Sequence, residues 1–260
     1  MILVSIVLFY VLFVSTNSLP TEQRNPIFQT ESHENLRTRE LYFTELSTNL
    51  QYNYVNDQGD YRLYKLIPKP TINQAQIKIV NKWLEQYLQQ SFERPEGDYS
   101  NVLQFCGTTI LAFFLRNSTL SIKNINALLL AHLQPYDNSQ YVCFLSTLKE
   151  HRQKGLGTKL LNVFINDAIR ANHSRISLHV NTENTNAFSL YSKCGMRCIQ
   201  YIPEYYFGDR TFPTQNAFLM SLQLKNIINS TTICQSTAAI NIPNAEETFY
   251  KQRCPQAFTG

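Results

Sequence analysis

The chain has 260 residues, of which 43% are hydrophobic and 16% charged, so it can bury a sizeable core and is not a disordered polyelectrolyte. This length fits one α/β domain with extensions at its ends better than two full-sized domains. The net charge of +4 is spread without a run of Lys or Arg, which gives no footprint for nucleic-acid binding.

Residues 1–18 have the pattern of a targeting segment or a membrane anchor. From Ile2 to Val14 nearly every residue is apolar, and small polar residues follow. A helix of this length spans about 20 Å, less than the roughly 30 Å of a hydrocarbon layer, so a signal peptide fits better than a spanning helix. We therefore predict a lumenal or secreted location in the secretory pathway. The alternatives are a membrane anchor, if the segment is not cleaved, and a buried N-terminal element.

Six cysteines are compatible with an oxidising compartment, although they permit fifteen pairings. Cys106 and Cys143 lie in apolar runs and are interpreted as small buried hydrophobes, whereas Cys234 and Cys254 bracket a polar tail and could close it as a loop. Free thiols are equally compatible with the spacing. No C-x-x-C pair and no His pair at ligand spacing occurs, so no metal is predicted. Glycosylation sequons, which agree with secretion without demonstrating it, begin at Asn117, Asn172 and Asn229.

The first predicted strand marks the start of the folded core. Residues 19–60 are polar and have no sustained period, so they are predicted as an extension. A strand is predicted over Tyr61–Ile67, ended by Pro68 and Pro70, and a helical stripe over Ile72–Phe92. Beyond these, β-rich runs are predicted over Val102–Leu115, Ala127–Leu133 and Tyr141–Leu148, helices over Leu156–Ala171 and Thr185–Cys194, and strands over Arg175–Val180, Arg197–Tyr201 and Phe218–Leu222.

The order of these elements predicts an α+β fold with a mixed central sheet flanked by helices. Because one strand, helix and strand follow each other directly after Tyr141, at least one parallel β-α-β unit is expected. The last segment, residues 225–260, is a polar tail that need not pack.

The junction between the strand at Tyr141–Leu148 and the following helix predicts an anion site. Gly155 and Gly157 permit close approach of the backbone, and free N–H groups with the positive end of the helix dipole favour a diphosphate. Arg152 and Lys154 add positive charge. Neither G-x-G-x-x-G nor G-K-[ST] occurs, so the common nucleotide fingerprints are excluded at this turn. A plain glycine-rich turn is the alternative.

This turn, Arg152-Gln153-Lys154-Gly155-Leu156-Gly157, resembles the pyrophosphate loop R/Q-x-x-G-x-G/A of the GNAT acetyltransferase superfamily. The likeness covers roughly residues 61–224, taken as a GNAT N-acetyltransferase domain. Within the superfamily, the pattern is most similar to N-terminal protein acetyltransferases of the NatF type. Residues in register with these patterns are Tyr141, Leu178-His179-Val180, Asn184, Ala187, Tyr191, Gly195-Met196 and Tyr201-Ile202-Pro203-Glu204-Tyr205-Tyr206.

The resemblance implies acetyl-CoA as co-substrate and a peptide or protein amine as acceptor. It gives Tyr141 and His179 the role of catalytic bases; a strand aromatic and a satisfied strand histidine are the alternatives. It implies cofactor contacts at Leu145, Thr147, Arg152, Gln153, Lys154, Gly155, Leu156, Gly157, Thr158, Asn184 and Tyr191. Asn184 alone could instead cap the helix that follows. On the substrate side it implies Phe92, Tyr205 and Tyr206, the two tyrosines forming either a lid or hairpin packing.

Strand periodicity gives these roles an expected geometry. By alternation, Ile176, Leu178 and Val180 share one face of their strand, whereas Ser177 and His179 share the other. His179 is therefore expected to point away from that apolar set. Tyr141, Cys143, Leu145 and Thr147 are likewise expected on one face. The strand from Tyr141 to its end covers about 23 Å, comparable to an extended pantetheine arm. Tyr141 is thus expected near the reacting carbon when the turn holds the diphosphate.

The chain departs from its relatives in two places. Relatives that acetylate Met-starting peptides carry F-P-x-x-Y after the first helix, whereas Phe92-Glu93-Arg94-Pro95-Glu96 lacks the Tyr and shifts the Pro. NatF-like enzymes end in amphipathic membrane-binding helices, and residues 226–260 show no apolar stripe. A lysine or small-amine acetyltransferase, or a catalytically silent secreted binding protein on a GNAT scaffold, are therefore the alternative functions.

Overall fold

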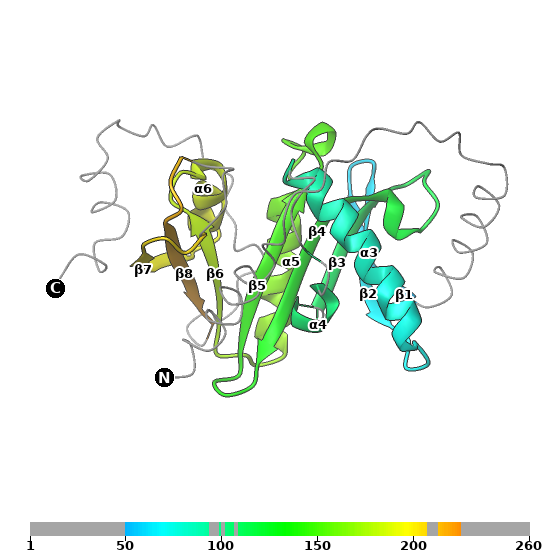
Figure 1. The fold of residues 1–260 in the computed structure, drawn as a ribbon, viewed down its shortest axis with the longest axis horizontal. Helices are drawn as coiled ribbons and strands as arrows, with labels where there is room; N and C mark the ends of the chain where they lie inside the picture. The colour runs from blue at the N-terminus through cyan, green and yellow to red at the C-terminus, as the bar shows by residue number, and fades with distance from the viewer. Residues whose placement is uncertain (1–49, 94–98, 100–101, 107–108, 207–212, 225–260) are drawn as a thin grey trace, which may run out of the picture. The chain divides into compact units, whose positions relative to one another are not determined.

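An eight-stranded mixed sheet organises the part of the chain that the computed structural model describes, residues 50–93, 99, 102–106, 109–206 and 213–224 (Figure 1). Its strands are β1 (Leu50–Gln58), β2 (Tyr61–Pro68), β3 (Thr109–Leu115), β4 (Ile125–Gln134), β5 (Ser139–Thr147), β6 (Arg175–Asn181), β7 (Arg197–Ile202) and β8 (Ala217–Gln223). They lie in the order β1-β2-β3-β4-β5-β6-β8-β7. The pair β5 and β6 is parallel, with its crossover through α5 (Leu156–Arg170), and the predicted α+β fold is confirmed.

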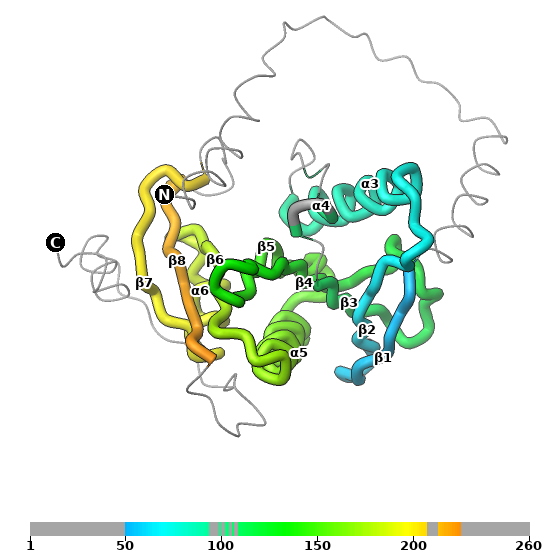
Figure 2. Tube along the Cα trace, turned by 90° about the horizontal axis from the view of Figure 1, so that it is seen from below, coloured from blue at the N-terminus to red at the C-terminus, as the bar shows by residue number. Residues whose placement is uncertain are grey.

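Helices cover both faces of the sheet. Helices α3 (Gln74–Ser91) and α4 (Val102–Cys106) lie on one face and α5 on the other (Figure 2). Because both faces are covered, central strands such as β4 are apolar along most of their length rather than alternating. The shorter helix α6 (Thr185–Lys193) contributes Phe188 and Tyr191 to the apolar core on the α5 side.

Two elements differ from the sequence prediction. Strand β1 lies within the segment predicted as a polar extension. It was not predicted because an edge strand with a solvated face needs few apolar residues; in β1, Leu50 is buried, whereas Tyr54 is exposed. The run from Val102 to Cys106, predicted as strand, is helical. Its two end residues are four positions apart and both are buried, which is the spacing of one helix face.

A β-bulge interrupts β5 at Cys143. Val142 pairs with Ala131 of β4 and Phe144 pairs with Leu130, so Cys143 has no residue opposite it. A bulge of this kind adds one residue to a strand and changes the face on which the following side chains lie.

The bulge overturns the expectation that one strand face carries Tyr141, Cys143, Leu145 and Thr147. Cys143 packs into the core on the α3 side. Beyond the bulge, Leu145 and Thr147 pair with core residues of β4 that belong to the α5 side. Alternation alone gave the wrong face because the sequence carries no sign of the extra residue.

The sheet opens where β5 meets β6. The parallel ladder holds only two residue pairs, Gln140 with Ile176 and Tyr141 with Ser177. Beyond Tyr141 the two strands diverge (Figure 1), so the ladder ends in the middle of the sheet. As far as pairing among the described strands is concerned, backbone groups on the facing edges of β5 and β6 are thereby left available to a bound ligand.

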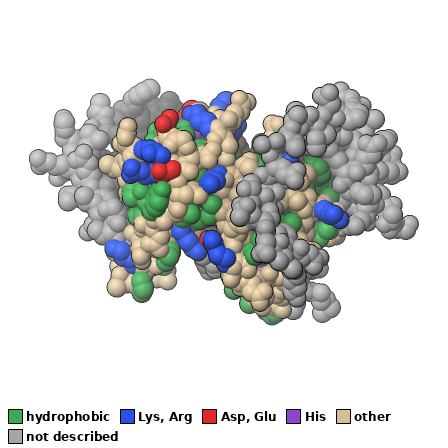
Figure 3. All heavy atoms as spheres, turned by 180° about the vertical axis from the view of Figure 1, so that it is seen from behind, with side chains coloured by type: hydrophobic (Ala, Val, Ile, Leu, Met, Phe, Trp, Pro, Cys, Tyr) green, Lys and Arg blue, Asp and Glu red, His purple; other side chains and the backbone are tan. Residues whose placement is uncertain are grey.

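Several sequence predictions lie outside the described residues. These are the apolar segment 1–18, most of the extension 19–60, the tail 225–260, and the proposed loop closed by Cys234 and Cys254. Among the residues that the structure does describe, no helix is long and apolar enough to cross a membrane. Figure 3 shows Lys and Arg side chains spread over the described part of one face, in agreement with the dilute positive charge of the sequence.

Candidate active site

The turn before α5 leaves the start of that helix open. The N-cap residue is Gly155, whose φ of 75° is left-handed and which offers no side chain to cap the helix. Within the described residues, no hydrogen bond engages the N–H groups of Gly155, Leu156, Gly157 or Thr158. The first turn also carries no acidic residue. These amides and the helix dipole can therefore accept an anion such as a diphosphate.

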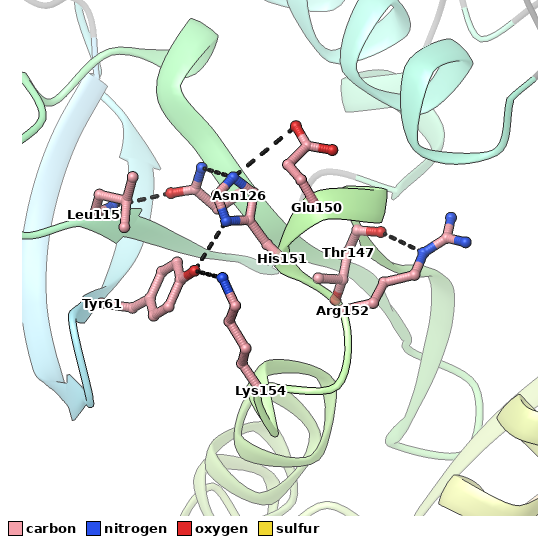
Figure 4. Close-up of polar contacts among 8 residues, drawn as sticks. All are labelled: Tyr61, Leu115, Asn126, Thr147, Glu150, His151, Arg152 and Lys154. Carbon is pink, nitrogen blue, oxygen red and sulfur yellow. Dashed lines mark hydrogen bonds and ion pairs between the residues drawn. The ribbon is translucent and has the colours of Figure 1, made fainter.

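A side-chain network fixes this turn to the sheet (Figure 4). Asn126 accepts a hydrogen bond from the Leu115 N–H through Oδ1 at 2.9 Å, which turns its Nδ2 toward His151 Nε2 at 3.1 Å. Nε2 then accepts, so Nδ1 of His151 donates to the Tyr61 hydroxyl oxygen at 2.9 Å. Lys154 Nζ donates to the same oxygen at 2.9 Å. The turn is thereby tied to β2 and β4. Of these groups, sequence reasoning had singled out Lys154 but not Tyr61, Asn126 or His151.

Arg152 binds the protein's own carbonyl groups. Its Nε donates to the Thr147 carbonyl at 3.1 Å, and its Nη2 donates to the Ser91 carbonyl at 2.8 Å. Glu93 lies 3.6 Å from Nη1. Arg152 thus joins the end of β5 to the end of α3, and its direct contact with a diphosphate stays a prediction, as it does for Gln153 and Lys154.

Helix α6 packs against the open start of α5. A Cβ added at Gly157 would lie 3.4 Å from Leu190 Cδ1, so this position has little room for a side chain. Asn184 caps α6 by accepting a hydrogen bond from the Ala187 N–H at 3.1 Å, as the alternative interpretation of this residue expected. Tyr191 is buried, which raises the pKa of its hydroxyl.

The structure brings Tyr141, His179 and Tyr205 together at the point where β5 and β6 part. The Tyr141 hydroxyl lies 2.7 Å from His179 Nδ1 and 3.3 Å from the Tyr205 hydroxyl. The Tyr205 ring stacks on the imidazole with centroids 4.1 Å apart, and Tyr206 meets Tyr205 edge to face. The alternation of β6 places His179 opposite the buried face of Leu178, as predicted.

Burial keeps both members of the Tyr141–His179 pair neutral. It raises the pKa of Tyr141 well above its ordinary value, and the neighbouring Tyr205 acts in the same direction. It lowers the pKa of His179 to about 4. At neutral pH the pair therefore holds a phenol and an uncharged imidazole, which can pass a proton between them but carry no fixed charge.

Aromatic side chains gather at the end of α3. Phe92 stacks on Tyr99 with centroids 6.3 Å apart and approaches Phe144 of β5 at 6.2 Å. Tyr99 was not predicted, because the F-P-x-x-Y pattern places no Tyr at that position. Most of the segment between Phe92 and Tyr99 lies outside the described residues.

A disulfide joins Cys106 of α4 to Cys143 of β5, with Cα atoms 6.0 Å apart. The alternative that these two residues are free thiols is therefore wrong, whereas Cys106 is buried in the apolar core as predicted. Cys194 and Cys198 are also disulfide-bonded. Donor atoms of Cys106, His132 and Cys143 all lie within 4.8 Å of one another, a spacing that could hold a metal ion. Since the two sulfurs are bonded to each other, the thiolates that such an ion needs are absent from this form.

The model of the acetyltransferase (GNAT) family matches residues 81–196, from α3 to the end of the loop before β7. Residues 81–196 belong to the GNAT family. This part of the chain is an acetyl-CoA-dependent acetyltransferase region, and the helix start and turn described above lie inside it.

Solved structures resemble this chain at low sequence identity. The ribosomal-protein-S18-alanine N-acetyltransferase from Escherichia coli is 13% identical with a TM-score of 0.49, over 65% of this chain and 99% of that one. Ard1 from Thermoplasma volcanium is 14% identical with a TM-score of 0.46, over 64% and 98%. The spermidine N-acetyltransferase from Vibrio cholerae is 16% identical with a TM-score of 0.45, over 64% and 97%.

We expect Gly155→Ala to weaken acetyl-CoA binding. A Cβ at this left-handed position costs roughly 1–2 kcal/mol, and the backbone can relieve the strain only by turning the amides of the helix start away. Gly195→Ala is the matched control, because it imposes the same strain at a left-handed glycine after α6. Calorimetric titration should show the dissociation constant raised about tenfold for Gly155→Ala and within about twofold for the control. Equal effects in both variants would contradict the assignment.

The lowered pKa of His179 predicts that this residue accounts for part of the fall in the free energy of unfolding at acid pH. An unfolded histidine binds a proton near pH 6.5, whereas the folded one does so only near pH 4, so stability falls as the pH drops through this window. From pH 7 to 4.5 we expect the wild type to lose on the order of 2 kcal/mol more unfolding free energy than His179→Gln. Urea titrations at both pH values measure the difference. Identical losses would show that His179 is not held neutral.

Proposed function

We propose that the protein transfers the acetyl group of acetyl-CoA to the N-terminal α-amine of a peptide or protein, in the manner of NatF-type enzymes. The observation that carries this proposal is the neutral Tyr141–His179 pair at the opening between β5 and β6. The diphosphate would bind at the open start of α5, and the pantetheine arm would follow the free edge of β5 toward this pair.

The reaction needs two proton transfers. The neutral amine attacks the thioester carbon, the new ammonium loses a proton, and the C–S bond breaks to release the CoA thiolate, which takes up a proton. His179 can receive the proton of the amine, directly or through the Tyr141 hydroxyl. The raised pKa of Tyr141 favours a role as a hydroxyl relay over that of a phenolate base.

The weak basicity of His179 favours an α-amine acceptor. Deprotonating an α-ammonium group at pH 7 costs roughly 1 kcal/mol, whereas a lysine side chain costs nearly 5. An imidazole whose pKa is about 4 has little power to deprotonate a lysine. The acceptor that this pair serves best is therefore one that is already partly neutral at working pH.

The surroundings of Phe92 also favour a peptide over a polyamine. A polyamine acceptor requires acidic groups that pair with its additional ammonium groups. Glu93 follows Phe92, but its carboxylate already contacts Lys149 at 3.3 Å and Arg152 at 3.6 Å. The aromatic contacts of Phe92 with Tyr99 and Phe144 offer an apolar wall for a peptide side chain instead.

We expect Tyr141→Phe and His179→Ala each to lower kcat about 10²-fold or more, because each removes one half of the proton path. The exposed residue Tyr136 provides the control, and Tyr136→Phe should retain the wild-type rate. Thiol release from acetyl-CoA with a peptide library gives the rates. Wild-type rates in the two site variants would contradict the proposed roles.

The same assay separates the alternative functions. Mass spectrometry of the product shows whether the acetyl group is on the α-amine, on a lysine side chain or on a small amine. Thermal stabilisation by acetyl-CoA without thiol release from any amine would favour a silent binding protein.

We further propose that the protein enters the secretory pathway. The apolar segment 1–18 supports this, as do the disulfide bonds of Cys106, Cys143, Cys194 and Cys198, since disulfides persist in oxidising compartments. Two of the three sequons fall in the described residues, and both acceptors, Asn117 and Asn172, are exposed turn residues.

Expression of the full chain in a eukaryotic secretory host should therefore attach glycans. Of the two described acceptors, Asn117 is preferred, because its sequon ends in Thr and that of Asn172 ends in Ser. We expect a mobility shift on treatment with an N-glycosidase, reduced in Asn117→Gln. Asn162→Gln, at an asparagine outside any sequon, is the control. An unglycosylated product would contradict this location.

A further inference from the structure

We propose that the Cys106–Cys143 disulfide and His132 are positioning groups for Tyr141, so that the acetyltransferase is fully active only when this disulfide is formed. The inference concerns the same site and rests on the proposed role of Tyr141. It starts from the place of Cys143, which is at once the extra residue of the β5 bulge and one end of the disulfide.

The disulfide holds the bulge where ladder hydrogen bonding does not. Cys143 has no partner residue in β4, and β5 has lost its ladder to β6 two residues earlier, after Tyr141. Strand β5 therefore has the least pairing to its neighbouring strands in the residues just after Tyr141. The bond to Cys106 ties the bulge to α4, whose residue Val102 is buried in the core on the α3 side.

His132 connects the disulfide to the tyrosine ring. Its Nδ1 lies 3.3 Å from Cys143 Sγ, and because a disulfide sulfur carries no hydrogen, Nδ1 is the donor. The imidazole also packs against the Tyr141 ring, with centroids 5.3 Å apart. His132 and Tyr141 are directly opposite each other across β4 and β5. The ring of Tyr141 is therefore held between His132 on one side and the hydrogen bond to His179 on the other.

Loss of the disulfide weakens the support of Tyr141 in two ways. Reduction by a dithiol breaks the S–S bond, the dithiol is oxidised to its own disulfide, and Cys106 and Cys143 each gain a hydrogen. The bulge is then free to move, and His132 loses its fixed acceptor. A shift of the Tyr141 hydroxyl by about 1 Å is enough to lower a rate substantially.

The first test removes the disulfide without reducing the others. The double variant Cys106→Ala, Cys143→Ala should lower kcat about tenfold or more while KM for acetyl-CoA stays within about threefold, because the helix start that binds the diphosphate is unchanged. Rates are measured well below the melting temperature of the variant, and thermal stabilisation by acetyl-CoA reports that the domain is folded. A kcat within about twofold of the wild type overturns the proposal.

The second test acts on His132 with the disulfide intact. His132→Ala should lower kcat about tenfold, and His132→Gln, which keeps an N–H donor for the sulfur, should recover part of the loss. Leu133→Ala is the matched control, since it shortens an exposed neighbour on the same strand. Equal rates in the alanine and glutamine variants, or an equal loss in the control, count against a positioning role.

A third measurement separates this proposal from the proposed function. In protein labelled with ¹³Cζ tyrosine, the Tyr141 signal, assigned with Tyr141→Phe, should shift in the double cysteine variant. That shift can be read even if the wild type acetylates no amine, in which case only the proposed function fails. An unchanged signal overturns the positioning role. The proposal is also contradicted if zinc restores full activity to reduced wild-type protein by binding Cys106, His132 and Cys143, because the disulfide would then not be required.

Discussion

The short parallel pairing of β5 and β6 is the constraint on which the site depends. Two residue pairs hold the strands together, and both lie at the level of Tyr141. Had the ladder continued, the facing edges of β5 and β6 would be occupied by each other. Because it stops, the same residue that ends the ladder also forms the hydrogen bond to His179 and marks the inner end of the opening.

Different interactions act at the two ends of the proposed cofactor path. At the outer end, the amides of the N-cap glycine and of the first three residues of α5 have no partners among the described residues, and the helix dipole adds to their attraction for an anion. The nearby cations are bound to the protein itself, Arg152 to two carbonyls and Lys154 to Tyr61. At the inner end, burial removes charge from Tyr141 and His179 and leaves a proton path.

Much of the fold could be predicted from periodicity. Helix α5 was placed within one residue at each end, because its apolar stripe and its glycines are both visible in the sequence. Strand β1 was missed because an edge strand with one solvated face has a weak apolar pattern, and the bulge at Cys143 was missed because an extra residue leaves no compositional mark. The disulfide between Cys106 and Cys143 was one of fifteen possible pairings.

The sequence by itself determined the glycine turn, the strand before it, the helix after it and the identity of Tyr141 and His179 as candidates. These are local features, because a helix start and a strand face depend on residues close together in the chain. Only the tertiary structure decided that Tyr205 stacks on His179, that His132 lies between Tyr141 and the disulfide, and that both titratable groups are neutral. Those properties depend on distances between residues far apart in the chain and on how much water the surrounding core excludes.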